Sequence, residues 1–319
     1  MNRPLSAAVV VCAASAEREP LLRACVDSLL EGARRPDEIL VVVDQNPALE
    51  VSVASWLPCS ARLLRSPAPG ISASRNAGLR AARSDIVAFV DDDAVAEPDW
   101  LHRLLQQFSD ADDVLGVGGA VVPEWETSGR WLPEELLWVV GCTYLGHREN
   151  AGPIRNPIGC NMAFRRRELT AIGGFSTEFG KRGAALNTCD ETELGLRVER
   201  RFGPSRIRCV PGARVRHHIP AARIGWKTLV LRCVSEGLSK ARLRQAYGRS
   251  ALGTERNYAA RLVTRRVPLL LLRGVIRRDS RSVLGAAAIM LSLVVTSAAY
   301  AGGALLAPHT GIEIGDRAR

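Results

Sequence analysis

Three adjacent carboxylates close an apolar segment of this chain. Residues 86–90 read Ile-Val-Ala-Phe-Val, and Asp91, Asp92 and Asp93 follow directly. The apolar run is typical of a buried parallel strand, and acids that cannot enter a core must lie at its carboxyl end. Open α/β sheets bind ligands at that end, and a hard divalent cation with a bound diphosphate would suit the cluster. The alternative is a loop that caps the following helix with first-turn acids.

Two further polar clusters lie downstream. Asp190 and Glu191 stand at the start of a predicted helix, where first-turn acids are common. A carboxylate placed there, after a glycine-bearing loop, could instead take the proton from an attacking hydroxyl. His217 and His218 follow a predicted strand. One imidazole, together with Asp93, diphosphate oxygens and water, would form the mixed oxygen and nitrogen ligand set that suits Mn²⁺ or Mg²⁺.

Polar residues upstream of the acidic strand could reach the same sheet edge. Asp44 ends the predicted strand 39–43 and could accept a hydrogen bond from a base or ribose, or could serve a turn. Arg75 and Asn76 lie on the helix that precedes the acidic strand. An arginine there could bind diphosphate oxygens through paired hydrogen bonds, although Arg75 taken alone is typical of a solvated helix position.

The elements that must position these residues alternate along the chain. Strands and helices that follow one another in this way predict an α/β fold with a doubly wound, mostly parallel sheet. The predicted strands cover 7–12, 39–43, 61–64, 86–90, 114–122, 162–164 and 206–210, and the helices cover 19–30, 71–83, 99–108, 166–172, 191–201 and 221–247.

Composition narrows the class of protein. The 319 residues are 47% hydrophobic and 24% charged, which is ordinary for a globular chain of one large or two modest domains. Eight cysteines are scattered without a CxxC or a paired Cys/His spacing. This pattern argues against a zinc site and a disulfide framework, and it fits a reducing compartment.

The charge is concentrated before an apolar tail. Net charge is +10, and residues 249–282 hold nine arginines against two acids. Residues 283–307 then carry no charge, and at about 1.5 Å per residue they can cross a bilayer, although a buried core helix is the alternative. The short apolar segment 267–272, flanked by arginines, is typical of an interfacial helix.

These patterns predict four segments. They are a catalytic domain over 1–220, a basic helical and partly interfacial segment over 221–282, a transmembrane helix over 283–307 and a short tail over 308–319. By the positive-inside rule the bulk of the chain lies on the cytoplasmic side of the cell membrane. A nucleic-acid partner is not predicted, because the excess charge abuts an apolar segment and has no interleaved aromatic residues.

Together the motifs have the order and spacing of a known family. The chain resembles family 2 glycosyltransferases over roughly residues 7–245, in a membrane-associated form, through segments 9–12, 41–44, 70–78, 89–93, 159–165, 173–175, 190–194 and 217–220. The resemblance implies the A-type nucleotide-diphospho-sugar transferase fold. It also implies inverting transfer of a sugar from a nucleotide-diphospho-sugar to a hydroxyl acceptor. A bound metal ion would neutralise the leaving diphosphate.

The resemblance assigns roles by position. Asp91 and Asp93 match the family D-x-D motif and would hold Mn²⁺ or Mg²⁺ with His217, or with His218 after a one-residue shift. Asp92, between them, is expected to lie beside the nucleotide sugar in a structural role. The residues placed at the nucleotide sugar are Cys12, Ala13, Asp44, Arg75, Asn76, Asp91 and Asp92.

A second group of residues is assigned to the side of the acceptor, whose hydroxyl attacks the donor sugar. Glu191 falls at the family's base carboxylate, with Asp190 as the alternative, because the family motif is usually Glu-Asp and here the order is reversed. Gly174 and Phe175 would lie on the acceptor side. The donor is expected to carry UDP or dTDP ahead of GDP, and the acceptor to be a cell-envelope, lipid-linked or polysaccharide glycan.

Two other functions stay open at this point. A sugar nucleotidyltransferase would carry a glycine-rich basic loop after the first strand, and residues 13–17 have none. A catalytically inactive membrane-bound partner protein is left open by the reversed Asp190-Glu191 order. The segment Ser-Glu-Gly-Leu-Ser-Lys over 235–240 also resembles membrane-associated members, and the sequence gives it no role.

Overall fold

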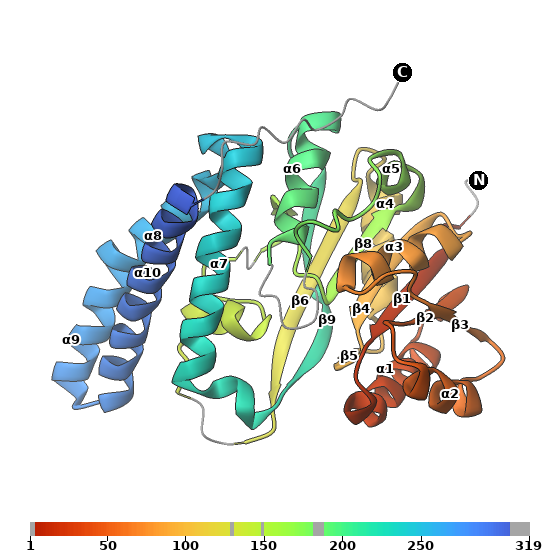
Figure 1. Ribbon diagram of the computed structural model, residues 1–319, viewed down its shortest axis with the longest axis horizontal. Helices are drawn as coiled ribbons and strands as arrows, with labels where there is room; N and C mark the ends of the chain where they lie inside the picture. Colours follow the sequence, from red (N-terminus) through yellow and green to blue (C-terminus); the bar gives the residue numbers. More distant parts are fainter. Residues whose placement is uncertain (1–3, 128–130, 148–149, 181–187, 307–319) are drawn as a thin grey trace. The chain divides into compact units, whose positions relative to one another are not determined.

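The chain forms two compact units. The computed structural model describes residues 4–127, 131–147, 150–180 and 188–306 (Figure 1). Unit 1 takes its described residues from 4–126, 141–147, 150–180 and 190–219. Unit 2 takes them from 127, 131–140, 188–189 and 220–306.

Unit 1 is built on a mixed sheet. In the described part of the chain it contains β1 (Ala7–Ala13), β2 (Glu38–Val43), β3 (Ala61–Arg65), β4 (Ile86–Asp91), β5 (Ala94–Ala96), β6 (Gly116–Trp125), β7 (Gly152–Pro153), β8 (Asn161–Arg165) and β9 (Ile207–Ile219). Their order is β3-β2-β1-β4-β8-β6-β9-β5, with β7 beside β9. Strands β1 to β4 pair in parallel, as the sequence predicts, and so do β6 and β9. Antiparallel pairing joins β8 to β4 and β6, and β5 and β7 to β9.

Strand β9 corrects one boundary. The predicted strand 206–210 runs on to Ile219, so His217 and His218 lie inside a strand and not after it. Its second half alternates exposed arginines with buried residues. This period of two is the pattern of a strand with one buried face, and a search for continuous apolar residues does not find it.

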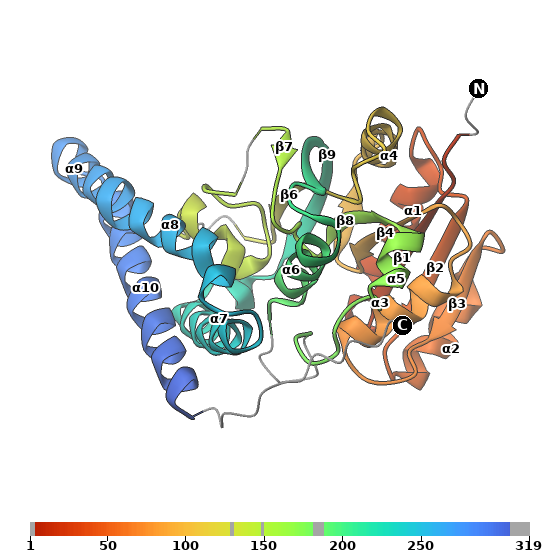
Figure 2. The same ribbon diagram turned by 90° about the horizontal axis from the view of Figure 1, so that it is seen from above.

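Helices cover both faces of the sheet. They are α1 (Glu19–Glu31), α2 (Pro47–Trp56), α3 (Ile71–Ala81), α4 (Trp100–Asp110), α5 (Arg166–Ala171) and α6 (Asp190–Phe202). Figure 2 shows α1 and α4 on one face and α3, α5 and α6 on the other. Helix α2 was not predicted; Asn46 caps it by accepting from the Leu49 amide at 3.1 Å, and Pro47 begins it.

Unit 2 is helical. Its helices are α7 (Trp226–Tyr247), α8 (Gly253–Arg261), α9 (Val267–Arg277) and α10 (Ser280–Leu306), with the shorter turns η2 (Glu134–Val140), η3 (Ala221–Ile224), η4 (Arg249–Leu252) and η5 (Leu262–Arg266). The helix predicted over 221–247 is divided at Gly225. A core of Leu136, Leu229, Cys233 and Ile289 joins η2, α7 and α10.

Helix α10 contains the predicted membrane segment. Over Ser280–Leu305 it is, within the described residues, the one helix long and apolar enough to cross a bilayer, and 28% of its most apolar window is buried. Helix α9 extends past the predicted 267–272 segment and exposes Val275 and Ile276. Residue 307 and the predicted tail 308–319 lie outside the described residues.

The buried side-chain amide of Asn161 on β8 links helix α4 to strands β6 and β9. The Asn161 side chain accepts from Trp100 Nε1 at 2.8 Å and donates to the carbonyl oxygens of Ala120 and Ala213 at 2.8 and 2.9 Å. Gly119 lies against this network at the register shift between β6 and β9. A Cβ at Gly119 would collide with the Ala213 carbonyl and with the Asn161 amide.

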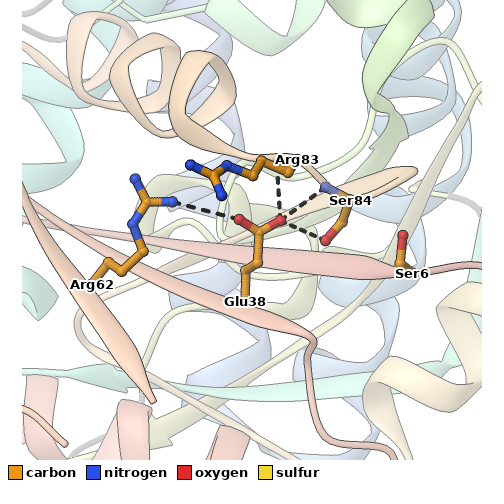
Figure 3. Close-up of a pocket in the computed structure, with 5 residues that line it drawn as sticks. All are labelled: Ser6, Glu38, Arg62, Arg83 and Ser84. Atoms are coloured by element: carbon orange, nitrogen blue, oxygen red, sulfur yellow. Dashed lines mark hydrogen bonds and ion pairs between the residues drawn. The ribbon is translucent and has the colours of Figure 1, made fainter. Parts of the chain in front are cut away.

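A polar pocket lies at the opposite, amino-terminal edge of the strands, lined by Ser6, Glu38, Arg62, Arg83 and Ser84 (Figure 3). The Glu38 carboxylate accepts from the backbone amides of Arg83 and Ser84 at 2.8 Å each and from Ser84 Oγ at 2.6 Å. These bonds attach the start of β2 to the loop before β4. The polar residues of this pocket therefore stabilise the fold, and we assign them no part in substrate binding.

We predict that Gly119→Ala lowers the free energy of unfolding by about 2 kcal/mol or more, because the new methyl group meets backbone that cannot move freely. Gly32→Ala is the matched control, since its Cβ would meet Pro98 O at an ordinary 3.5 Å. Urea titration of both variants measures the difference. Equal stability of the two variants would contradict the packing described at Asn161.

We predict that Glu38→Gln destabilises unit 1 in a pH-dependent way. Burial opposes ionisation of Glu38, but the Ser84 hydroxyl and the two backbone amides outweigh it and hold its pKa below 4.5. Stability from a lowered carboxyl pKa is present above the ordinary value and lost as the pH falls. The difference in urea midpoint from wild type should therefore be largest near neutral pH and shrink below 4.5. Glu31→Gln, at an exposed position, should show no such trend.

Candidate active site

The acidic end of β4 lies where the sequence predicts. Asp91 is the last residue of β4 and is paired in register with Cys12 of β1. Asp92 and Asp93 follow and are only 2% and 4% exposed. Buried carboxylates are costly unless a cation or donor compensates them. Their partners therefore define the site.

Arg18 is a cation that contacts both of these acids. It ends the short turn η1 (Ala16–Arg18) after β1, and its Nη1 lies 2.9 Å from Asp92 Oδ1 and 2.7 Å from Asp93 Oδ2. Burial opposes the Arg18 charge, but the two carboxylates outweigh burial and raise its pKa. The sequence interpretation missed Arg18. The order of strands in the sheet could have located Arg18, because β1 pairs with β4 and the loop after β1 therefore lies beside the acids.

His217 is the histidine that faces the carboxylates. Strand β5 pairs with β9 and sets Ala94 opposite His217, whose Nε2 lies 3.1 Å from Asp93 Oδ1. Cys142 Sγ lies 3.7 Å from the other ring nitrogen. The backbone amide of His218 donates to the Asp93 carbonyl at 2.8 Å. Because side chains alternate along a strand, the His218 ring points to the other face.

The donor types at this edge fit a hard divalent cation. Asp91 and Asp93 offer carboxylate oxygens and His217 an imidazole nitrogen, the set expected for Mn²⁺ or Mg²⁺. Within the described residues, no three side chains of His, Cys, Asp or Glu are grouped as a complete metal site. Asp93 and His217 converge. Asp91 instead faces Arg75, with its Oδ1 3.6 Å from Arg75 Nη2.

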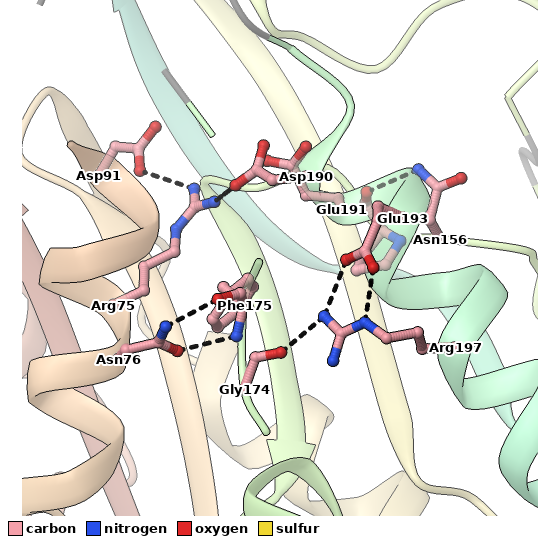
Figure 4. Close-up of polar contacts among 11 residues, drawn as sticks. Arg75, Asn76, Asp91, Asn156, Gly174, Phe175, Asp190, Glu191, Glu193 and Arg197 are labelled. Carbon is pink, nitrogen blue, oxygen red and sulfur yellow. Dashed lines mark hydrogen bonds and ion pairs between the residues drawn. The ribbon is translucent and has the colours of Figure 1, made fainter. Parts of the chain in front are cut away.

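Arg75 joins the two acidic clusters. It projects from α3, is 4% exposed, and its Nη1 lies 2.8 Å from Asp190 Oδ2 and 3.2 Å from Glu191 Oε1 (Figure 4). Asp91 completes the set on its other side. Gly159 makes room for the arrangement, because a Cβ there would collide with Glu191 Oε1 and lie 2.5 Å from Arg75 Nη2. Arg75 is therefore a buried hub, not a solvated helix residue.

The two acids of α6 differ in their surroundings. Asp190 is 7% exposed in its side chain, and burial with the adjacent Glu191 raises its pKa against the attraction of Arg75. Burial likewise raises the pKa of Asp91, and Arg75 counteracts it. The Glu191 side chain is 21% exposed, so it is the more accessible of the two acids.

Asn76 is hydrogen-bonded to the backbone of Phe175, one of the two residues predicted to face the acceptor. Its side-chain amide donates to Phe175 O at 2.7 Å and accepts from Phe175 N at 2.8 Å, which occupies both ends of the amide. Gly174 has a left-handed φ of +70°, and a Cβ there would collide with Asn76 Oδ1. The Phe175 ring is buried and lies edge-on to Phe89 at 5.0 Å. Both Asn76 and Phe175 thus shape the site from within the core.

A second arginine fixes the same turn from α6. Arg197 forms an ion pair with Glu193, with Nε 2.7 Å from Oε1, and donates to the Gly174 carbonyl at 2.7 Å (Figure 4). It also donates to the Ile172 carbonyl at 2.6 Å. The sequence interpretation did not single out this pair. It links α6 to the turn before Phe175 and so fixes the helix that carries Asp190.

Asp44, Cys12 and Ala13 are the residues predicted to meet the nucleotide at the sheet edge. Asp44 Oδ2 accepts from the Gly70 amide at 2.9 Å, as a turn residue would. Asp44 Oδ1 is buried and has no hydrogen-bond partner among the described residues, which leaves an acceptor at the sheet edge. Cys12 and Ala13 are 9% and 2% exposed. Burial raises the pKa of the Cys12 thiol, so Cys12 is a neutral residue here.

Comparison with known sequences gives one family. Residues 8–173 match the model described as Glycosyl transferase family 2. The glucosyl-dolichyl phosphate glucuronosyltransferase of Haloferax volcanii is 33% identical over 245 residues, which cover 74% of this chain and 76% of that protein. The succinoglycan biosynthesis protein ExoM of Rhizobium meliloti is 27% identical over 275 residues, covering 82% and 75%.

Solved structures show the same fold. The mannosyltransferase PcManGT from Pyrobaculum calidifontis, solved with GDP-Man and Mn²⁺, has a TM-score of 0.58 at 17% identity and covers 92% of this chain and 87% of its own. GalNAc-T7, solved with UDP, GalNAc and Mn²⁺, has a TM-score of 0.53 at 13% identity, covering 82% and 55%.

The order of the motifs, the sheet that carries them and the family match agree. The chain belongs to glycosyl transferase family 2 and is a glycosyltransferase.

Proposed function

We propose that this enzyme transfers a sugar, with inversion and with the help of a divalent metal, from a nucleotide-diphospho-sugar to a hydroxyl of a lipid-linked or cell-envelope glycan. One observation carries the proposal. Arg75 draws Asp91 of the strand end and the Asp190-Glu191 pair of α6 to a single guanidinium, at 2.8 to 3.6 Å. A donor-binding edge and a candidate base therefore meet at one point.

Glu191 is the proposed general base. A base must reach the acceptor hydroxyl, and Glu191 is three times as exposed as Asp190, at 21% against 7%. It also lies farther from Arg75, so less of its charge is compensated. Asp190 is proposed to orient Arg75 through its ion pair with the guanidinium.

The donor would bind across the carboxyl edge of the sheet. Asp93 and His217, with Asp91 nearby, would hold Mn²⁺ or Mg²⁺, which as a Lewis acid would neutralise the leaving diphosphate. Asp44 Oδ1 is the proposed acceptor for the base or ribose. UDP and dTDP remain the nucleotides expected ahead of GDP.

The acceptor proposal rests on the relatives. The name of the Haloferax volcanii relative contains glucosyl-dolichyl phosphate, and that of the Rhizobium meliloti relative contains succinoglycan biosynthesis. The first name concerns a lipid-linked sugar and the second a polysaccharide, which suits a chain with an apolar tail. We therefore propose an acceptor that is presented at a membrane.

Membrane association is proposed through α9 and α10. Helix α10 has the length and composition of a spanning helix, and the arginines before it would keep unit 1 on the cytoplasmic side. Helix α9 presents exposed Leu272, Val275 and Ile276 near Arg273 and Arg277. This combination suits an interface with anionic lipid.

We predict that Glu191→Gln reduces transfer by about 10²-fold or more while nucleotide-sugar binding is kept, because only the proton acceptor is removed. Glu199→Gln, at an exposed position of the same helix, should transfer like wild type. The assay compares transfer of labelled sugar to membrane acceptor with donor affinity by calorimetry. Retained transfer in Glu191→Gln would assign the base to another group, and Asp190→Asn would be tested first.

We predict that the full-length protein stays with membranes in 1 M salt, since α10 inserts into the bilayer. Val294→Asp should release it, because an Asp at the centre of a spanning helix costs about 2.5 to 3.5 kcal/mol. Val51→Asp is the control, since Val51 is 74% exposed on α2 in unit 1. Flotation with vesicles measures both. Release of the wild-type protein by salt alone would contradict insertion.

A further inference from the structure

Helix α7 holds the two residues that precede α6. The Thr188 amide donates to Ser239 Oγ at 3.1 Å, and Thr188 Oγ1 donates to Glu236 Oε2 at 3.0 Å. Cys189 Sγ lies 3.7 Å from Glu236 Oε1. All four residues belong to unit 2, and Asp190 follows Cys189 directly in the chain.

The backbone at Cys189 is in a conformation that needs support. Its φ is +78°, in the left-handed region that non-glycine residues rarely adopt. Such residues persist where surrounding contacts over-determine them, and they concentrate at functional sites. The next two residues are Asp190 and Glu191, so the turn at Cys189 sets the direction in which both acids leave the chain.

The Glu236 carboxylate is itself fixed. Lys240, one helical turn later, places Nζ 2.9 Å from Glu236 Oε1 and 3.0 Å from Glu255 Oε1. Burial opposes ionisation of Glu236, but Lys240, Arg232 and the Thr188 hydroxyl together outweigh burial and lower the pKa of Glu236. An ionised carboxylate makes stronger hydrogen bonds than a neutral one. Glu236 is thus a firm partner for Thr188.

The same segment packs tightly against α10. A Cβ at Gly237 would collide with the Thr296 carbonyl and lie 2.8 Å from Tyr300 N. Ser235, two residues earlier, is fully buried. The segment 235–240 therefore has little freedom to shift, because α10 lies against Gly237 while Glu236, Ser239 and Lys240 form the polar network.

We infer that Glu236 is a positioning residue, which through Thr188 and Cys189 fixes the start of α6 and so orients Asp190 and Glu191 for transfer. The role rests on the proposed function of Glu191. Glu236 belongs to unit 2 and acts through the two residues it holds. The inference also gives a role to the Ser-Glu-Gly-Leu-Ser-Lys segment at 235–240.

The test compares Glu236→Ala and Glu236→Gln with Glu134→Ala, which removes an exposed acid of unit 2. Since a displacement of about 1 Å can cost about 10²-fold in rate, Glu236→Ala should lower kcat 10- to 100-fold with the donor KM within twofold of wild type. Glu236→Gln keeps an acceptor for Thr188 and should lose less. Glu134→Ala should match wild type.

Hydrogen exchange on the folded proteins separates this inference from the assignment of the base. Amides of 188–193 should exchange at least 10-fold faster in Glu236→Ala, while those of β1 and β4 stay protected. A Glu191→Gln enzyme that still transfers would refute the proposed base, yet faster exchange at 188–193 would still support positioning. Unchanged exchange at 188–193, or a kcat within twofold of wild type in Glu236→Ala, would overturn the inference. If Glu236→Ala does not fold, Glu236→Gln is measured in its place, and exchange at 188–193 together with a kcat that both equal the wild-type values would overturn the inference.

Discussion

The site depends on one buried cation. Arg75 is almost fully enclosed and is shared by Asp91, Asp190 and Glu191. A buried charge is tolerable only when partners compensate it, and removing a partner leaves the others uncompensated. Helix α3, the end of β4 and the start of α6 are therefore held together by electrostatics. Gly159 and Asn76 supply the space and the turn that this requires.

The acidic edge is organised by the same rule. Arg18 forms ion pairs with Asp92 and Asp93, and His217 contacts Asp93 from β9. A metal bound by Asp93 would join acids that already have partners, so Arg18 and His217 would set how strongly the edge attracts a cation. Asp92 is buried and paired with Arg18.

The sequence predicted what local patterns encode. Apolar runs ending in Asp44 and Asp91 located the strand ends, because parallel strands place such acids at one edge. Arg18 and the Arg197–Glu193 pair were missed, since their roles arise from neighbours distant in the chain. Helix α2 was missed because its apolar residues do not share one face, since Leu49 and Val53 are buried while Val51 is exposed. The second half of β9 was missed because its apolar residues alternate with charged ones. Those elements depend on tertiary packing.

Thermal unfolding of the wild-type protein with UDP-, dTDP- and GDP-sugars, each with and without Mn²⁺, tests the central claim most directly. A ligand at 100 times its Kd stabilises a protein by about 2.7 kcal/mol, which a shift in Tm reports. We expect a UDP- or dTDP-sugar to raise the Tm, and Mn²⁺ to enlarge the shift. The absence of a shift with every nucleotide sugar, in both conditions, would contradict a donor site at the carboxyl edge of the sheet.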